Sequence, residues 1–114
     1  MNDVVSIVCK AIGEKKGKDL IVYDYTKLNP FIDYAIIASA GNQRQVFALA
    51  QNVVDRAKEV GIKVKSMEGN KDSRWLLVDL DTVVVHVFLD EERKVYKLEQ
   101  LYADLPVVET HEDV

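Results

Sequence analysis

The stretch RWLLVDLDTVVVHVFLDEERKVYKLEQLY, residues 74–102, decides the fold of this chain. Two runs within it, 75–80 and 83–89, are rich in β-branched and aromatic residues and are separated by a short turn, which predicts a β-hairpin. Side chains alternate between the two faces of a strand, and in both runs each face is largely apolar. A hairpin with one face in water would alternate apolar and polar residues. We therefore expect this hairpin to be central in its sheet and covered on both sides, by helices or by another molecule.

The rest of the chain predicts the other layers of an α/β fold. Apolar periodicity and capping residues predict helices from about Asp3 to before Gly17, from Asn42 to Gly61, and from Asp90 to before Pro106. We expect Asp90 to cap this last helix, whose apolar stripe is Val95, Leu98, Leu101 and Tyr102. Further strands are predicted over residues 19–24, 34–40 and 62–67. The order α-β-β-α-β-β-β-α gives a mixed sheet of about five strands with three helices, too few to cover both faces of the sheet.

Composition places the chain among ordinary globular proteins. Its 114 residues suit one domain, which we expect over residues 1–106, followed by an acidic and flexible tail over residues 107–114. The formal net charge of −4 argues against a protein whose main role is to neutralise nucleic-acid phosphates. No apolar run suits a membrane span, and the single Cys9 cannot form an internal disulfide. We expect a cytoplasmic protein that neither spans nor binds a membrane.

The acidic residues gather toward the end of the chain. Residues 99–114 contain no Lys or Arg, and their acidic members are Glu99, Asp104, Glu109, Glu112 and Asp113. A solvated segment that maintains solubility is the plainer interpretation, and docking to a basic protein surface is the alternative.

Few residues suggest catalysis. Asp79 and Asp81 stand two apart at the hairpin turn, where an Asp-x-Asp pair could hold Mg²⁺ for nucleotidyl transfer, but Asp is also a common turn residue. His86 lies in an apolar run with no identifiable Ser or Cys nucleophile, and His111 is far from it in the sequence. The pattern favours a turn role for the aspartates and a hydrogen-bonded role in the core or at an interface for His86. It favours no metal site and no cofactor.

Trp75 is more informative for binding. It is the only Trp and follows a polar loop at the start of a strand, so it suits either a core position or an interface anchor. Aromatic and Arg side chains dominate binding hot spots, and Tyr96 and Arg93 in the next segment could be its companions.

These residues also carry a family resemblance. The sequence resembles the ribosomal silencing factor family, also called Iojap-like proteins, over nearly its whole length. The matching motifs are DYAIIA at 33–38, WLLVD at 75–79, VVVHVF at 83–88, and Arg93, Tyr96, Leu98, Glu99 and Leu101. The sequence departs from the family pattern at Ile32, where Thr is usual, at Asp81-Thr82, where Gly-Asp is usual, and at Tyr102, often Trp.

The resemblance implies a non-enzymatic bacterial or organellar protein that binds the large ribosomal subunit. It would attach to the large-subunit protein numbered fourteen, on the face that meets the small subunit, and block subunit joining when nutrients are scarce. Direct nucleic-acid contact would be minor. The implied fold resembles that of nucleotidyltransferases without their catalytic residues, and family members are often homodimers.

We expect the partner to be bound by one set of residues, Glu68, Trp75, Leu77, Asp79 and Tyr96, supported by Tyr34, His86 and Arg93. Two other hypotheses stay open at this point. One is a metal-dependent nucleotidyltransferase-like enzyme that uses Asp79 and Asp81. The other is a self-associating domain whose apolar sheet face forms a dimer.

Overall fold

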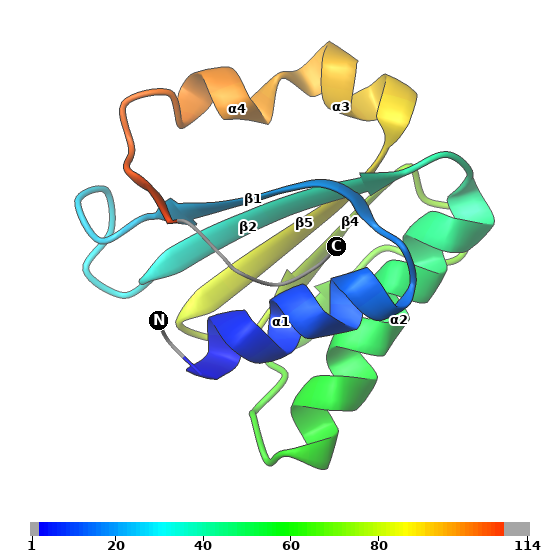
Figure 1. Cartoon of the computed structure of the whole chain (residues 1–114), viewed down its shortest axis with the longest axis horizontal. Coiled ribbons are helices and arrows are strands. Elements are labelled where there is room, and N and C mark those ends of the chain that lie inside the picture. The colour runs from blue at the N-terminus through cyan, green and yellow to red at the C-terminus, as the bar shows by residue number, and fades with distance from the viewer. Residues whose placement is uncertain (1–2, 109–114) are drawn as a thin grey trace.

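A six-stranded mixed β-sheet forms the middle layer of the molecule (Figure 1). The computed structural model of the chain describes residues 3–108. The strand order is β3-β4-β5-β2-β1-β6; β2 and β5 are parallel, and the other neighbours are antiparallel. The strands are β1 Lys18–Asp24, β2 Tyr34–Ala40, β3 Ser66–Glu68, β4 Trp75–Asp79, β5 Val83–Leu89 and β6 Val107–Val108.

Helices lie on both faces of this sheet. The helices α1 (Asp3–Glu14) and α2 (Gln43–Glu59) cover one face, and the short helices α3 (Asp90–Tyr96) and α4 (Leu98–Leu101) lie over the other (Figure 1). The predicted mixed α/β class is therefore confirmed. The structure has one more strand than expected, because residues 107–108 pair with β1, and its last helix is divided in two.

The larger core lies between the sheet and the pair α1 and α2. Leu76 and Val78 of β4 and Val83, Val85 and Val87 of β5 point into it and are buried. Helix α2 begins where its sequence predicts, because the Asn42 side chain accepts a hydrogen bond from the backbone N–H of Gln45 at 2.9 Å. In that helix, Asn52 Nδ2 donates to the carbonyl of Ala11 at 2.8 Å, which fixes α1 against α2.

The expected single helix after β5 is wrong in its second half. Lys97 takes a left-handed conformation, with φ of 50°, which ends α3 and shifts the helical period. Val95 and Leu101 of the predicted apolar stripe are consequently exposed, each at 71%. The cap position is Leu89 and not Asp90, whose carboxylate accepts a hydrogen bond from Lys18 instead.

The second core is smaller and leaves part of the sheet uncovered. Its members are Tyr23, Ala35, Ile37, Phe88, Tyr102 and Leu105, so the segment after α3 covers β1, β2 and β5. Strand β4 lies between β5 and the edge strand β3, and its Trp75 is 36% exposed on this face. The expectation that the hairpin is covered on both sides therefore holds for most of β5 but not for β4.

Two expectations concern the end of the chain. Residues 107–108 of the predicted acidic tail form β6 and pair with Val22 and Tyr23 of β1. His111 and the acidic residues Glu109, Glu112 and Asp113 lie outside the described residues. The division into a domain over 1–106 and a flexible tail stays a prediction.

Gly69 gives a test of the turn that leads into β4. Its φ is +114°, and a Cβ atom there would collide with the side chain of Leu76, which belongs to the larger core. Gly61 is a matched control, because its φ is +79° but a Cβ atom would meet no heavy atom within 4 Å. We expect Gly69→Ala to lower the free energy of unfolding in urea by about 2–4 kcal/mol, and Gly61→Ala by about 1 kcal/mol. Equal effects would contradict the close packing of this loop on β4.

Candidate functional site

Three aromatic side chains meet on the sheet face that α3 and α4 leave partly open. Trp75 of β4 pairs across the ladder with Phe88 of β5, and their rings stack with centroids 4.8 Å apart. Tyr96, the last residue of α3, packs against the same indole, with its ring centroid also 4.8 Å from that of Trp75. Phe88 is fully buried, whereas Trp75 and Tyr96 are 36% and 54% exposed. The indole thus contacts both a buried platform and an exposed phenol ring, whose own centroids lie 6.3 Å apart.

His86 fixes the orientation of this indole. Trp75 Nε1 donates a hydrogen bond to His86 Nδ1 at 3.2 Å, which requires an unprotonated Nδ1. Burial lowers the pKa of His86 from 6.5 to about 4, so the imidazole is neutral at pH 7. The histidine therefore acts as a hydrogen-bond acceptor that aligns Trp75.

The remaining members of the expected partner-binding set lie on the same face. Leu77 pairs with Glu68 of β3 on one side and with His86 on the other, and Asp79 follows two residues along β4. Glu68 is exposed, and Leu77 and Asp79 are half-buried. The structure therefore brings the five expected residues together, and we call this surface the open face: Glu68, Trp75, Leu77, Asp79 and Tyr96.

The three expected supporting residues have different places. His86 contacts Trp75 directly. Arg93 is buried beneath α3, where its Nη1 donates to Ser39 Oγ at 3.1 Å and its Nε lies 3.3 Å from Glu99 Oε2, so it anchors α3 to β2. Tyr34 packs against the larger core on the opposite face of the sheet. Its position gives it no direct contact with the open face.

The two aspartates considered for metal binding are used by the hairpin turn. Asp79 Oδ1 accepts a hydrogen bond from the backbone N–H of Asp81 at 2.9 Å. Asp81 has φ of 73°, a conformation that Gly would adopt without strain, which fits the Gly usual at this position in the resembled family. Among residues 3–108, no group of three or more His, Cys, Asp or Glu side chains is arranged to hold a metal ion.

Two contributors to the site were missed from the sequence. Phe88 is the platform under Trp75. Its position opposite Trp75 in an antiparallel hairpin is the sequence feature that could have predicted this contact. Arg74 and Glu92 form an ion pair at 3.4 Å beside the cluster, joining the start of β4 to α3. Their pairing could not be predicted without knowing where α3 crosses the sheet.

Comparison with known proteins identifies the family. All of residues 1–114 match the family described as "Ribosomal silencing factor during starvation". The chain belongs to the ribosomal silencing factor family. A ribosomal silencing factor of Bacillus subtilis is 40% identical over 106 residues, which cover 93% of this chain and 90% of that protein. The chloroplastic Iojap protein of Zea mays is 31% identical over 102 residues, 90% of this chain and 44% of that protein.

Solved structures support the same assignment. A Chromobacterium violaceum protein superposes with a TM-score of 0.86 at 33% identity, covering 100% of this chain and 97% of that one. A Bacillus halodurans protein does so with a TM-score of 0.84 at 33% identity, covering 95% and 98%. The predicted family is thereby confirmed. Within the described part of this chain, no helix combines the length and apolar character needed to cross a membrane.

The buried His86 predicts a pH dependence of stability. Its pKa is about 4 in the folded protein and near 6.5 when exposed, so the unfolded chain binds the proton first as pH falls. Protonation therefore favours unfolding between about pH 6.5 and pH 4, by up to about 3 kcal/mol, and has no effect above this range. We expect His86→Gln, which can still accept from Trp75, to lose this component when urea unfolding is followed across pH 4–8. Parallel pH profiles for the two proteins would contradict it.

Proposed function

We propose that this protein binds the large ribosomal subunit in the cytoplasm, at the ribosomal protein numbered fourteen on the intersubunit face. By occupying that surface it prevents the small subunit from joining and represses translation under nutrient limitation. It acts by steric exclusion, without catalysis or a cofactor. Family membership supports the ribosomal role, and the open face supports the mode of attachment.

The exposed, prealigned indole of Trp75 carries this proposal. Its ring is stacked on Phe88, packed against Tyr96 and hydrogen-bonded to His86, so little side-chain freedom remains to be lost on binding. Aromatic anchors at the centre of a patch supply most of the affinity in many protein interfaces. Leu77 extends the apolar surface beside it, and Glu68 and Asp79 add polar groups at its edge.

Charge supports a basic protein partner. The chain has a formal net charge of −4, and Glu68 and Asp79 lie on the open face itself. An acidic surface gains association rate and orientation from a basic ribosomal protein, whereas it would repel exposed RNA phosphates. We therefore propose little direct contact with nucleic acid.

Size supports steric exclusion as the mechanism. The folded chain measures 33 × 33 × 26 Å along its principal axes. A body of this thickness, seated on the intersubunit face of the large subunit, holds apart two surfaces that must come into direct contact. A second copy could also cover the open face and form a homodimer, which ribosome binding would then have to displace.

Trp75→Ala tests the proposed anchor. We expect it to weaken binding to purified large subunits by about 2 kcal/mol or more, roughly thirtyfold, because the mutation removes the prealigned aromatic anchor of the open face. Phe31→Ala is a matched control, since Phe31 is an aromatic residue 80% exposed in the loop between β1 and β2. Unchanged affinity in a folded Trp75→Ala protein would remove this residue from the interface.

A subunit-joining assay tests the function itself. Purified large and small subunits are mixed with the protein, and formation of the joined ribosome is followed by light scattering. We expect inhibition that saturates with protein, and a shift to higher concentration for Tyr96→Ala, which removes the second exposed ring of the open face. No inhibition at saturating wild-type protein would refute the proposal. Sedimentation of the free protein would show whether a homodimer forms first.

A further inference from the structure

The two parallel strands at the centre of the sheet create a second surface feature. After β2 the chain passes to α2 on one face, and after the neighbouring β5 it passes to α3 on the opposite face (Figure 1). Connections that diverge in this way open a crevice beyond the carboxyl ends of the strands, where α/β proteins commonly bind ligands. A groove of about 710 Å³ begins near this end, at Ser39 and Asp90, and extends over the sheet between β1 and the helices α3 and α4.

A buried guanidinium lies in this groove. Arg93 is 8% exposed; one of its five N–H donors makes a hydrogen bond to Ser39, and its Nε forms an ion pair with Glu99. The contact with Glu99 involves one carboxylate oxygen at 3.3 Å, while Glu99 Oε1 is buried with no hydrogen-bond partner within residues 3–108. Arginine binds carboxylates and phosphates best through two parallel hydrogen bonds. Arg93 is therefore incompletely paired and suited to a further oxyanion.

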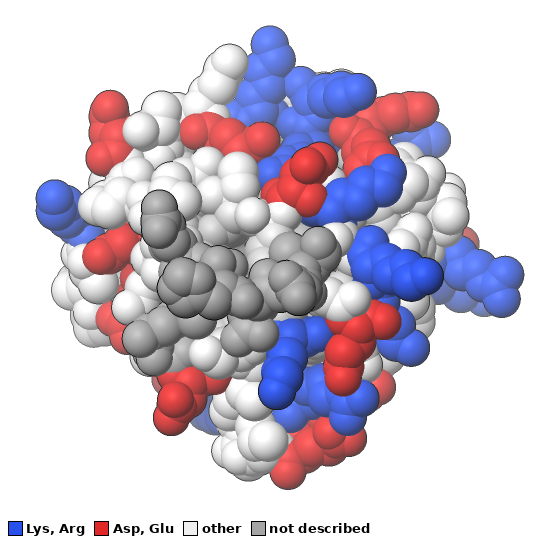
Figure 2. All heavy atoms as spheres, in the orientation of Figure 1, with Lys and Arg blue, Asp and Glu red and all other residues white. Residues whose placement is uncertain are grey.

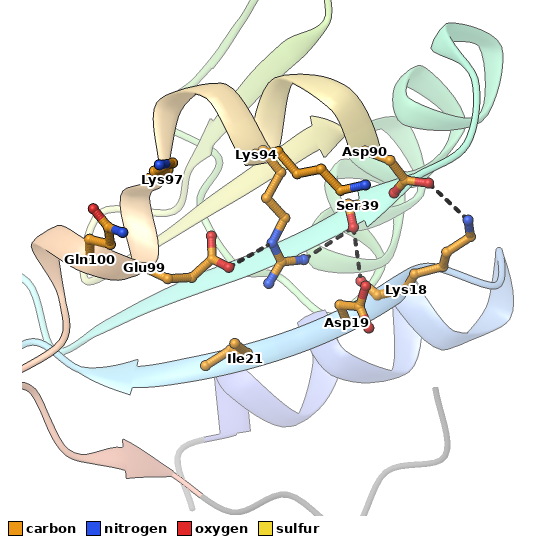
Figure 3. Close-up of a pocket in the computed structure, with 10 residues that line it drawn as sticks. Lys18, Asp19, Ile21, Ser39, Asp90, Lys94, Lys97, Glu99 and Gln100 are labelled. Carbon is orange, nitrogen blue, oxygen red and sulfur yellow. Dashed lines mark hydrogen bonds and ion pairs between the residues drawn. The ribbon is translucent and has the colours of Figure 1, made fainter.

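Lysines surround the groove in an otherwise acidic protein. Lys18 forms an ion pair with Asp90 at 2.9 Å, and Lys94 and Lys97 are exposed along the rim (Figure 3). The lining holds four basic residues and, counting Asp19, Asp90 and Glu99, three acidic ones. Figure 2 shows Lys and Arg gathered over the part of the molecule where α3 lies in Figure 1, with Asp and Glu between them. The local charge is thus positive although the whole chain is negative.

We propose that this groove binds a small phosphate-bearing metabolite, with Arg93 receiving one phosphate group and Lys94 and Lys97 the others. Its volume suits a ligand of nucleotide size. The guanidinium supplies planar hydrogen bonding, and the flexible lysines supply point charges. The site is distinct from the open face and does not rest on the proposed ribosome binding, although Arg93 and Tyr96 lie one turn apart on α3.

Calorimetric titration of the full chain with pyrophosphate and with ATP, both free of divalent metal, tests this site. We expect saturable binding that weakens at least tenfold in the double variant Lys94→Gln/Lys97→Gln, because the rim loses two charges. The double variant Lys63→Gln/Lys65→Gln changes net charge equally at exposed positions next to β3, at the far edge of the sheet, and should bind as wild type does. Glu99→Gln should tighten binding severalfold, because it removes the carboxylate that competes for Arg93.

Three results would overturn the proposal. One is the absence of saturable binding at ligand concentrations up to about 1 mM. Another is equal weakening by the two lysine double variants, which would show a general charge effect. The third is binding of a single-stranded RNA oligonucleotide that depends on Lys94 and Lys97 and is not reversed by pyrophosphate or ATP. That result would make the groove a nucleic-acid contact.

Discussion

The parallel pairing of β2 with β5 is the constraint on which the rest of the structure depends. Both strands are largely apolar and buried along most of their length, and their paired residues run in register from Tyr34 and Val83 to Ala40 and Leu89. Such strands must be covered on two sides, so the chain has to send helices to opposite faces of the sheet. One face receives α1 and α2, joined by the buried amide of Asn52. The other receives only α3, α4 and the segment that follows them.

The two helical layers differ in length, and this difference explains why the open face is left uncovered. Helix α2 has 17 residues, whereas α3 has 7 and α4 has 4, so the second layer covers β1, β2 and β5 but not β4. Trp75 sits at the boundary between the covered and uncovered regions, and its indole is aligned by the neutral His86. Apolar surface that the fold cannot cover is thereby arranged as a rigid patch, which is the form that a docking surface requires.

The sequence predicts this fold best where one local pattern dominates. The hairpin and α2 follow from β-branched runs and from the Asn42 cap, and the shared face of Trp75, Leu77 and Asp79 follows from strand alternation. The sequence did not predict the features of α3 that depend on tertiary contacts. Lys97 adopts a left-handed backbone conformation, and Arg93 instead of Val95 is the buried residue. Tyr34, expected as a supporting residue, has its side chain on the α1 and α2 face, as strand alternation from Ile36 requires. Strand β6 has only two residues, which is too short a pattern to predict its pairing with β1 from the sequence.

At Arg93, the side chain that would best stabilise the fold differs from the side chain that a ligand site requires. An apolar side chain beneath α3 could anchor the helix to β2 without desolvating a charge, and replacing buried ion pairs by apolar groups is often neutral or stabilising. The pair that the structure has is also imperfect, because Glu99 uses one oxygen and leaves the other buried without a partner in the described chain. Packing alone therefore gives a weak reason for a guanidinium at this position. A groove that opens onto it and is lined by Lys94 and Lys97 gives a stronger one.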